Sequence, residues 1–317
     1  MHYDDTSAAL ILPDVPPTTV VALFGPTGVG KTVVAIALAD RLRAEGEDPA
    51  AVSADALQVY RGLETLTGAA TTSEQARLEH RLLSILTVEK PFSAGEYARR
   101  AHAEIDGLLA AARRPIVVGG TGLYLRAALA ELDLRPPVPA AVRERRRAEL
   151  HERGAAALHA ELAERDPQAA AAVRPTDAQR LVRALELLDA GHAPPAGGQL
   201  WTADTRHPTL LAGLTMEREA LKARIDDRVR EMVAAGAADE VRAAAAAGAS
   251  ATVRKALGFQ ELLAGDVEAM QRSTRRYARR QLTWMRKLPD VLLLDTTERA
   301  PEHVAAELHA VLRAREA

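Results

Sequence analysis

A glycine-rich segment near the start of the chain has the residue types and spacing of a phosphate-binding loop. It reads Gly25-Pro26-Thr27-Gly28-Val29-Gly30-Lys31-Thr32 and fits G-x-x-x-x-G-K-[ST] at every fixed position. Glycines let the backbone wrap around a phosphate group with its N–H groups pointing inward, and a following helix adds its positive N-terminal end. Lys31 would bring charge to the terminal phosphate, and Thr32 would bring a hydroxyl to Mg²⁺. The motif predicts a diphosphate or triphosphate site but does not specify the reaction.

Asp55 is the second candidate for chemistry, because it follows a short apolar segment, residues 51–53, where a strand should end. A carboxylate beside a phosphate loop could hold Mg²⁺ through water or act as a general base. The alternative is an aspartate that caps a helix or lies in a surface turn, and position alone does not decide between the two.

A third strand is predicted at residues 115–118, and it ends in Gly119-Gly120-Thr121. A motor protein or GTPase usually places a metal-holding aspartate at the end of such a strand. The segment from Val291 to Asp295 imitates that pattern, but its place near the end of the sequence indicates an edge or final strand. The sequence also lacks Asn-Lys-x-Asp for guanine, so hydrolysis-driven motion is disfavoured.

Two arginines, Arg224 and Arg228, stand one helical turn apart on a helix predicted at residues 217–235. A pair so placed could clamp an oxyanion or a phosphate. On spacing alone, the favoured interpretation is a solvated face on which these arginines pair with neighbouring acids, namely Asp226, Asp227 and Glu231.

A strongly basic helix is predicted at residues 267–287, and only Glu268 offsets its charge. Tyr277 and Trp284 are interleaved with the basic residues. This pattern is typical of phosphate contacts along a nucleic acid backbone, with aromatic rings available for stacking. The basic residues are Arg272, Arg275, Arg276, Arg279, Arg280, Arg286 and Lys287.

The elements that must position these residues alternate between strand and helix through the first 135 residues. Strands are predicted at Val20–Phe24, 51–53 and 115–118, and helices at Lys31–Ala44 and 93–112. Ser93 and Glu96 have the spacing of a capping box at the start of the second helix. Such alternation predicts an α/β fold with a parallel sheet covered on both faces. Ligands bind at the carboxyl ends of such strands, so the phosphate loop, Asp55 and Thr121 should converge on one crevice.

Strand signals vanish between residues 136 and 206. Helical patterns cover residues 140–153, 155–165 and 177–190, and a Pro/Gly-rich mobile connection follows at 192–199. A strand at Thr209–Thr215 then resumes the sheet, and a last strand is predicted at 291–294. We therefore predict a P-loop NTPase-like core, residues 1–135 and 207–317, with an inserted all-helical domain at 136–206. Arg180 and Arg183 give that domain a second basic element.

Composition limits the class of protein. The 317 residues are 48% hydrophobic and contain no cysteine, which excludes disulfides, thiolate metal sites and a cysteine nucleophile. The histidines show no metal-ligand spacing, and no apolar run approaches the length of a membrane span. Residues 1–17 lack the basic start of a signal peptide. We expect a soluble, cytoplasmic monomer. The net charge of −2 argues mildly against nucleic acid as a partner, but the local distribution of charge is a better guide to partners than the net charge.

Taken together, the motifs resemble those of the tRNA dimethylallyltransferases, also called tRNA isopentenyltransferases. The matching segments run in order across nearly the whole chain. They are the phosphate loop, Asp55-Ala56-Leu57-Gln58-Val59-Tyr60-Arg61-Gly62, His80-Arg81-Leu82-Leu83, Phe92-Ser93-Ala94, Val118-Gly119-Gly120-Thr121-Gly122-Leu123-Tyr124, Asp166-Pro167, Asp177-Ala178-Gln179-Arg180-Leu181-Val182-Arg183-Ala184-Leu185-Glu186, Arg254-Lys255-Ala256-Leu257-Gly258-Phe259 and Arg279-Arg280-Gln281-Leu282-Thr283-Trp284. The chain departs from the family at Ala56, where a serine is usual, and at Leu66-Thr67-Gly68-Ala69-Ala70, where a Gly-Thr-Ala-Lys-Pro-like segment is usual.

The resemblance implies transfer of a dimethylallyl group from dimethylallyl diphosphate to N6 of adenosine 37 in tRNA, next to the anticodon, with Mg²⁺ as cofactor. Asp55 would accept the amine proton. Thr27, Lys31, Arg224 and a Thr32-bound Mg²⁺ would neutralise the departing diphosphate, which the whole loop from Gly25 to Thr32 would bind. The target base must leave its stack to react. The implied tRNA contacts are Asp55, Ala56, Leu57, Gln58, Thr121, Arg143, Gln179, Arg180, Leu181, Val182, Arg183, Arg275, Arg279 and Arg280.

Other classes of protein stay open on the sequence. A small-molecule kinase with the same loop would need an acceptor site and a lid arginine, but not the basic helix. A non-catalytic nucleic-acid-binding module that senses nucleotide would not need Asp55. A closer variant is an isopentenyltransferase acting on free adenine nucleotides, against which the helical insertion favours tRNA.

Overall fold

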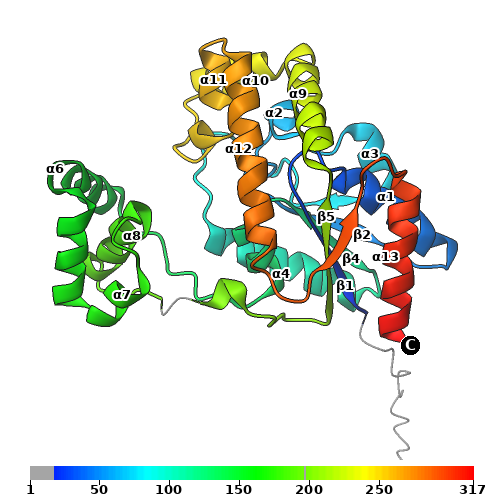
Figure 1. The fold of residues 1–317 in the computed structure, drawn as a ribbon, viewed down its shortest axis with the longest axis horizontal. Helices are drawn as coiled ribbons and strands as arrows, with labels where there is room; N and C mark the ends of the chain where they lie inside the picture. The colour runs from blue at the N-terminus through cyan, green and yellow to red at the C-terminus, as the bar shows by residue number, and fades with distance from the viewer. Residues whose placement is uncertain (1–17, 196–197) are drawn as a thin grey trace, which may run out of the picture.

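One six-stranded sheet forms the centre of the protein in our computed structural model, which describes residues 18–195 and 198–317. Its strands lie in the order β3-β2-β4-β1-β5-β6, and every neighbouring pair is parallel (Figure 1). The strands are β1 (Val20–Phe24), β2 (Ala50–Ala54), β3 (His80–Arg81), β4 (Pro115–Gly119), β5 (Thr209–Thr215) and β6 (Leu292–Asp295). The predicted parallel α/β core is therefore confirmed. The expectation about residues 1–17 lies outside the described residues.

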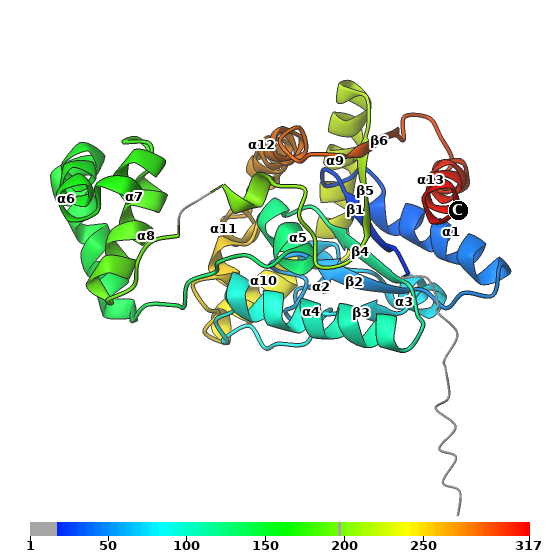
Figure 2. The same cartoon turned by 90° about the horizontal axis from the view of Figure 1, so that it is seen from below.

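Helices cover both faces of the sheet, which explains why β1 and β2 are buried along their whole length. One face packs against α1 and α13, with Leu23 beside Leu38 and Leu308 in a single cluster. The other face packs against α4 and α5 (Figure 2). The core helices are α1 (Lys31–Ala44), α2 (Glu64–Thr67), α3 (Thr72–Arg77), α4 (Ala94–Ala110), α5 (Gly122–Leu129), α9 (Arg218–Ala234), α10 (Ala237–Ala246), α11 (Phe259–Leu263), α12 (Val267–Met285) and α13 (Pro301–Glu316), with short 3-10 turns η1 (Gln199–Trp201) and η2 (Val253–Lys255).

Two details of the core differ from the sequence analysis. The two-residue strand β3 was not predicted, because so short a segment shows no alternation. At the start of α4, the Ser93 hydroxyl accepts the N–H of Glu96 at 3.1 Å, as predicted. The Glu96 carboxylate, however, accepts a bond from Arg100 at 2.9 Å, and the structure has only the Ser93 half of the predicted capping box. The last strand, β6, lies at the sheet edge, as expected.

The inserted region is all-helical, as predicted, and forms α6 (Ala140–Arg165), α7 (Pro167–Ala172) and α8 (Ala178–Asp189). Gly154, with a φ of 77°, divides α6 into the two predicted segments. Leu158, Leu162, Leu181 and Leu185 form a separate hydrophobic core. Figures 1 and 2 show these helices to one side of the sheet, joined to it by two chain segments. The insertion is thus built to fold around its own core.

A buried ion-pair network supplements that small core. Arg146 on α6 is almost fully buried, and its guanidinium contacts Asp189 of α8 at 2.6 Å and Glu161 at 2.7 Å. Hydrogen bonds from Arg146 hold the pKa of the Asp189 carboxyl well below its usual range. Because both partners are largely out of water, removing one would leave the other's charge uncompensated. The network therefore fixes α6 against α8.

Residues 199–206, which return from the insertion, lie against the core. Arg126 of α5 donates to Gln199 O at 3.4 Å, and Trp201 packs on Trp284 with ring centroids 4.6 Å apart. Arg206 pairs with Asp106 at 3.0 Å. The division at 136 and 206 stays a prediction, and these contacts place the last residues of that range with the core. The predicted mobile connection at 192–199 includes residues 196 and 197, which lie outside the described residues.

Candidate active site

The phosphate loop has a backbone that only glycine adopts without strain at two positions. Gly28 and Gly30 have φ values of 83° and 100°, in the left-handed region. A side chain at Gly28 would also come within 3.3 Å of Ile225 on α9. Helix α1 begins directly after the loop, with Gly30 as its N-cap. The loop therefore leads directly into the positive end of α1, an arrangement that favours the binding of an anion.

Lys31 lies folded against this loop. Its ammonium group donates to Gly25 O at 3.0 Å and to Pro26 O at 2.9 Å. Burial of the ammonium, followed by repulsion from Arg228, lowers the pKa of Lys31 to about 7, while the charge of Asp55 opposes the shift. An anion bound in the loop would favour the charged form.

Two arginines of α9 face the same region. An added Cβ on Gly30 would lie 3.5 Å from Nη2 of Arg224, so this guanidinium lies beside the loop. Arg228 donates to Gly68 O at 3.3 Å and is close enough to Lys31 to lower its pKa. Lys31 and Arg224 therefore lie at the loop, and Arg228 lies against Gly68 nearby.

Arg228 departs from the solvated-face interpretation, because its side chain is half-buried and reaches Gly68 O, whereas Arg224 is exposed on α9, as that interpretation expected. Two of the three acids expected to pair with them have other partners: Asp226 pairs with Arg275 of α12 at 2.6 Å, and Asp227 pairs with Arg230. The buried side of α9, formed by Leu221, Ile225 and Val229, fixes how the helix lies against the core. The contact of Arg228 with Gly68 depends on that packing and could not be predicted from spacing.

Asp55 lies just beyond the end of β2 and is held in a defined orientation. Its Oδ1 accepts the N–H of Leu57 at 2.9 Å and, more weakly, that of Gln58 at 3.4 Å. Its Oδ2 accepts a bond from the hydroxyl of Thr121 at 3.4 Å. That hydroxyl is also 3.0 Å from the hydroxyl of Tyr277 on α12. Burial and the nearby charge of Asp55 raise the pKa of Tyr277 to about 12.

The sheet register explains why these groups meet. Phe24, at the end of β1, is paired with Gly119, and Ala54 is paired with the same glycine from the other side. The loops after β1, β2 and β4 therefore start at one level, and the predicted convergence of the phosphate loop, Asp55 and Thr121 is confirmed. A side chain at Gly119 would overlap Ala54 O, so glycine is needed at this crossing point.

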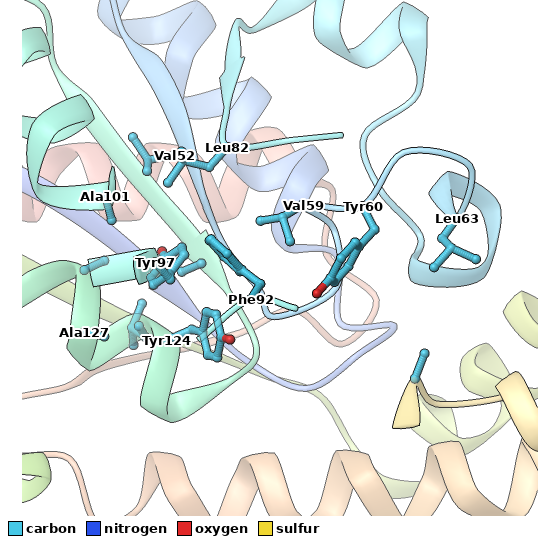
Figure 3. Packing of buried hydrophobic residues seen from close by; sticks show 14 of the residues in the cluster. Val52, Val59, Tyr60, Leu63, Leu82, Phe92, Tyr97, Ala101, Tyr124 and Ala127 are labelled. Atoms are coloured by element: carbon cyan, nitrogen blue, oxygen red, sulfur yellow. The ribbon is translucent and has the colours of Figure 1, made fainter. Parts of the chain in front are cut away.

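Aromatic residues pack beneath the end of β2 (Figure 3). The buried hydroxyl of Tyr97 donates to Ser53 O at 3.0 Å. Its ring packs on Tyr124 with centroids 4.6 Å apart and on the edge of Phe92 at 6.4 Å. This cluster fixes the backbone that leads into Asp55.

Gln281 of α12 is a site residue that was not among those predicted. Its side chain is buried, with 5% exposed. Its Oε1 accepts the N–H of Thr27 at 2.9 Å, and its Nε2 donates to Gly120 O at 2.7 Å. Its position within the Arg279–Trp284 motif is a sequence signal that could have identified it, although only the arginines of that motif were predicted as site residues.

Predicted tRNA contacts on the core occupy different surroundings. Ala56 and Leu57 are half-buried against the core, and Gln58 binds Ser53 and reaches Gly68 O at 3.3 Å. Arg279 and Arg280 are exposed on α12. Arg275 is held by Asp226, which distinguishes it from those two.

Predicted contacts on the insertion also divide into two groups. Gln179 and Arg180 are exposed at the start of α8, whereas Leu181 and Val182 are buried in the insertion's core, so their side chains support the helix. Arg143 and Arg183 both reach the buried carboxylate of Glu186, at 3.3 and 3.5 Å. Arg183 also donates to Pro136 O at 2.8 Å, where the chain enters the insertion.

A basic groove of about 800 Å³ runs between α9 and α12. Its floor is the apolar cluster of Leu221, Ile225 and Ala278. Its walls carry arginine and lysine side chains: Arg218, Lys222, Arg272, Arg275, Arg276, Arg279 and Arg286. This face of the protein suits a polyanion. Within the described residues, no helix is long and apolar enough to cross a bilayer.

The fold and site together define a phosphate-binding α/β protein in which a carboxylate, a glycine-rich loop and a basic helix meet at the carboxyl ends of parallel strands. The sequence profile of IPP transferase matches residues 58–288. With relatives that are more than 30% identical over most of their length, this shows that the chain belongs to the IPP transferase family.

The chain is 43% identical to the tRNA dimethylallyltransferase of Thermobifida fusca, over 86% of this chain and 89% of that protein. It is 40% identical to the tRNA dimethylallyltransferase of Salinispora tropica, over 93% of each. The crystal structure of the tRNA isopentenylpyrophosphate transferase of Bacillus halodurans superposes with a TM-score of 0.68 at 31% identity, covering 94% of this chain and 97% of that one. A eukaryotic dimethylallyltransferase acting on tRNA shares the fold, with a TM-score of 0.72 at 23% identity over 93% of this chain and 78% of that one.

Proposed function

We propose that this chain is a tRNA dimethylallyltransferase that transfers a dimethylallyl group from dimethylallyl diphosphate to N6 of adenosine 37, next to the anticodon. The observation that carries the proposal is the position of Asp55 beside Thr121, at the same sheet edge as the phosphate loop. Family membership and the printed names of its relatives support the same reaction. The kinase and nucleotide-sensor alternatives do not account for this combination.

Asp55 is the proton acceptor in this mechanism. The exocyclic amine of adenine is a poor nucleophile, because its lone pair is delocalised into the ring. As N6 forms a bond to C1 of the dimethylallyl group, Asp55 accepts the proton that the amine loses. The two backbone N–H bonds to Oδ1 and the Thr121 bond to Oδ2 hold the carboxylate in one orientation.

The phosphate loop receives the leaving group. The bond between C1 and the diphosphate oxygen breaks, and its electron pair stays on the diphosphate. Lys31, Arg224 and the N–H groups of the loop would stabilise that charge, with the Lys31 ammonium turning from Gly25 O and Pro26 O to the diphosphate. Thr27 lies within the loop, where its N–H donates to Gln281 Oε1 at 2.9 Å, and we assign its side chain to the diphosphate site.

The loop suits a Mg²⁺ ion that is bound mainly by the diphosphate and by water, with few protein ligands. Among the residues that the structure describes, no three His, Asp or Glu side chains come together as a metal-binding group. Mg²⁺ usually keeps several waters and binds through phosphate oxygens with one or two protein ligands. Thr32, at the first turn of α1, supplies such a hydroxyl. When bound, the ion would withdraw charge from the diphosphate.

tRNA binding involves α12 and the insertion. The exposed Arg279 and Arg280 offer phosphate contacts on the core, and Gln179 and Arg180 offer contacts from α8. Adenosine 37 must turn out of its stack to reach Asp55, which costs less in a loop than in a duplex. A tRNA substrate would place the enzyme in the cytoplasm, where we propose that it acts as a monomer.

The test is incubation of the protein with dimethylallyl diphosphate, Mg²⁺ and unmodified tRNA, followed by nucleoside mass analysis. We expect N6-isopentenyladenosine, and none from a tRNA that carries guanosine at position 37. Parallel reactions with free adenine nucleotides test the closer variant. Equal activity on tRNA and free nucleotide would overturn the tRNA assignment, and a phosphoryl product formed from ATP would overturn the prenyl transfer.

A further inference from the structure

Gln281 links the phosphate loop to the turn after β4, two segments that both belong to the proposed active site. Its amide accepts from the phosphate loop through Thr27 N–H and donates to the turn after β4 through Gly120 O. These two partners fix which end of the amide is oxygen and which is nitrogen, since a backbone N–H needs an acceptor and a carbonyl needs a donor. The side chain is therefore a specific link and not a space-filler.

The link belongs to a strip of side chains along the inner side of α12. Tyr277 lies one turn before Gln281 and contacts the Thr121 hydroxyl at 3.0 Å. Trp284 lies three residues after Gln281, and its ring covers Gly122. Three residues on one side of the helix, spaced four and three apart, thus contact the segment from Gly120 to Gly122.

That segment has no room for other residues. A Cβ on Gly120 would overlap the amide nitrogen of Gln281, and a Cβ on Gly122 would overlap the ring of Trp284. Because the fit is this close, a displacement of α12 would move the turn or break its contacts.

The other side of the same helix carries the exposed cations. Arg276 and Arg279 line the basic groove, on the side away from Gln281. Arg275 ties α12 to α9 through Asp226, and α9 carries Arg224 to the phosphate loop. A polyanion bound in the groove would therefore contact α12, and the opposite side of the same helix holds the phosphate loop through Gln281.

We infer that Gln281 is a positioning residue that couples tRNA docking on α12 to the affinity of the phosphate loop for the diphosphate substrate. This inference rests on the proposed function for the identity of both ligands. By holding Thr27 N–H, Gln281 keeps the loop in its binding conformation before the diphosphate arrives. Thermodynamic coupling is reciprocal, so the bound diphosphate also strengthens tRNA binding.

The experiment measures the dissociation constant of inorganic pyrophosphate by calorimetry, with and without saturating tRNA. In the wild-type protein, we expect tRNA to tighten pyrophosphate binding by about fivefold or more. In Gln281→Met, which has a similar length but no amide, we expect weaker binding by about tenfold, because Thr27 N–H and Gly120 O lose their partner. In this variant, the ratio of the pyrophosphate dissociation constant without tRNA to that with tRNA should fall to one.

Two further variants separate positioning from general damage. Gln281→Glu keeps the acceptor for Thr27 N–H and loses the donor to Gly120 O, so it tests the link if Gln281→Met does not fold. Gln271→Met, on the same helix, removes a bond from Gln271 to Asp226 O at 3.2 Å that does not reach the loop, and it should keep the wild-type ratio.

A wild-type ratio in both Gln281 variants would overturn the inference, even if the enzyme prenylates tRNA normally. The same would hold if tRNA had no effect on pyrophosphate binding in the wild-type protein. Failure of the proposed function would be recognised separately, by the absence of prenylated adenosine from wild-type reactions. A rise in KM for dimethylallyl diphosphate in Gln281→Met, larger than any fall in kcat, is expected in the complete reaction.

Discussion

Oδ2 of Asp55 accepts a hydrogen bond from Thr121 at 3.4 Å, although 66 residues separate the two in the chain. The parallel register of β2 and β4 brings the two loops together, so the contact follows from the sheet itself. It places the proposed proton acceptor beside a hydroxyl that helps to orient it.

Asp55→Asn should reduce turnover by a factor of about 10² to 10⁴, which is the usual effect of losing a general base. tRNA affinity should change little, because the amide keeps the size and the acceptor oxygen of the carboxylate. Single-turnover kinetics and filter binding measure the two quantities. Asp295→Asn is the matched control, since Asp295 also ends a parallel strand but binds Thr297. Turnover within tenfold of wild type would remove Asp55 from its assigned role.

Lys31→Met should weaken dimethylallyl diphosphate binding far more than tRNA binding. Wild-type affinity for the diphosphate should also fall as the pH rises above about 7, because the free enzyme then loses the ammonium charge. Calorimetry in buffers of different ionisation enthalpy should show proton uptake on binding near pH 8. Lys90→Met, at an exposed lysine, should show neither effect. Binding that is independent of pH between 6 and 9 would contradict this account of Lys31.

The same pKa shift has a consequence for stability. The folded-state pKa of Lys31 lies near 7 and its ordinary value is 10.5, so between these values the unfolded chain binds more protons. The free energy of unfolding should therefore rise with pH across this window, by at most about 1.4 kcal/mol per pH unit from this group. Urea unfolding of wild type and Lys31→Met at pH 7 and pH 9 measures it. Equal slopes for the two proteins would contradict the prediction.

Neutralising Arg279 and Arg280 together should weaken tRNA binding and flatten its salt dependence, with no change in pyrophosphate affinity. Each lost phosphate contact lowers the slope of log K against log salt by about 0.7 to 0.9. Arg41 and Arg315, exposed on α1 and α13, give a control pair of equal charge. If both pairs leave affinity and slope unchanged, α12 is only a solvated surface.

Arg275→Gln should behave differently from the Arg279 and Arg280 variants. Arg275 is half-buried against Asp226, so its removal leaves a poorly solvated carboxylate and should cost about 1–2 kcal/mol of stability. Asp226→Asn in the same protein should restore part of the loss. A double-mutant cycle by urea unfolding gives the coupling energy, and a value near zero would show that the pair does not join α9 to α12.

Deleting residues 140–195 and bridging the gap with a short glycine linker should leave a folded core that binds pyrophosphate. The insertion packs around Leu158 and Leu181 in a core of its own, so its removal exposes little of the sheet. Prenylation of tRNA should be nearly lost, because Gln179 and Arg180 are removed. Circular dichroism, calorimetry and nucleoside analysis check the three points. Near wild-type prenylation by the shortened protein would show that the insertion does not clamp tRNA.

Sequence alone determined the features that depend on near neighbours in the chain. The left-handed turns at Gly28 and Gly30, the apolar run of β1 and the helical periods of α6 and α12 result from backbone sterics and local hydrogen bonding. The basic surface of α12 could be predicted for the same reason, since a helix places residues three and four apart on one side. These local patterns sufficed for the fold class and the phosphate loop.

Tertiary structure alone decided which way side chains face across elements that are distant in the chain. Gln281 reaches Thr27 over 254 residues, and no local pattern identifies that contact. Arg228 reaches Gly68 O from α9, over 160 residues, while Leu181 is buried by α6. Such directions follow from the close packing of complete helices and strands, which is a property of the assembled core and not of any one segment.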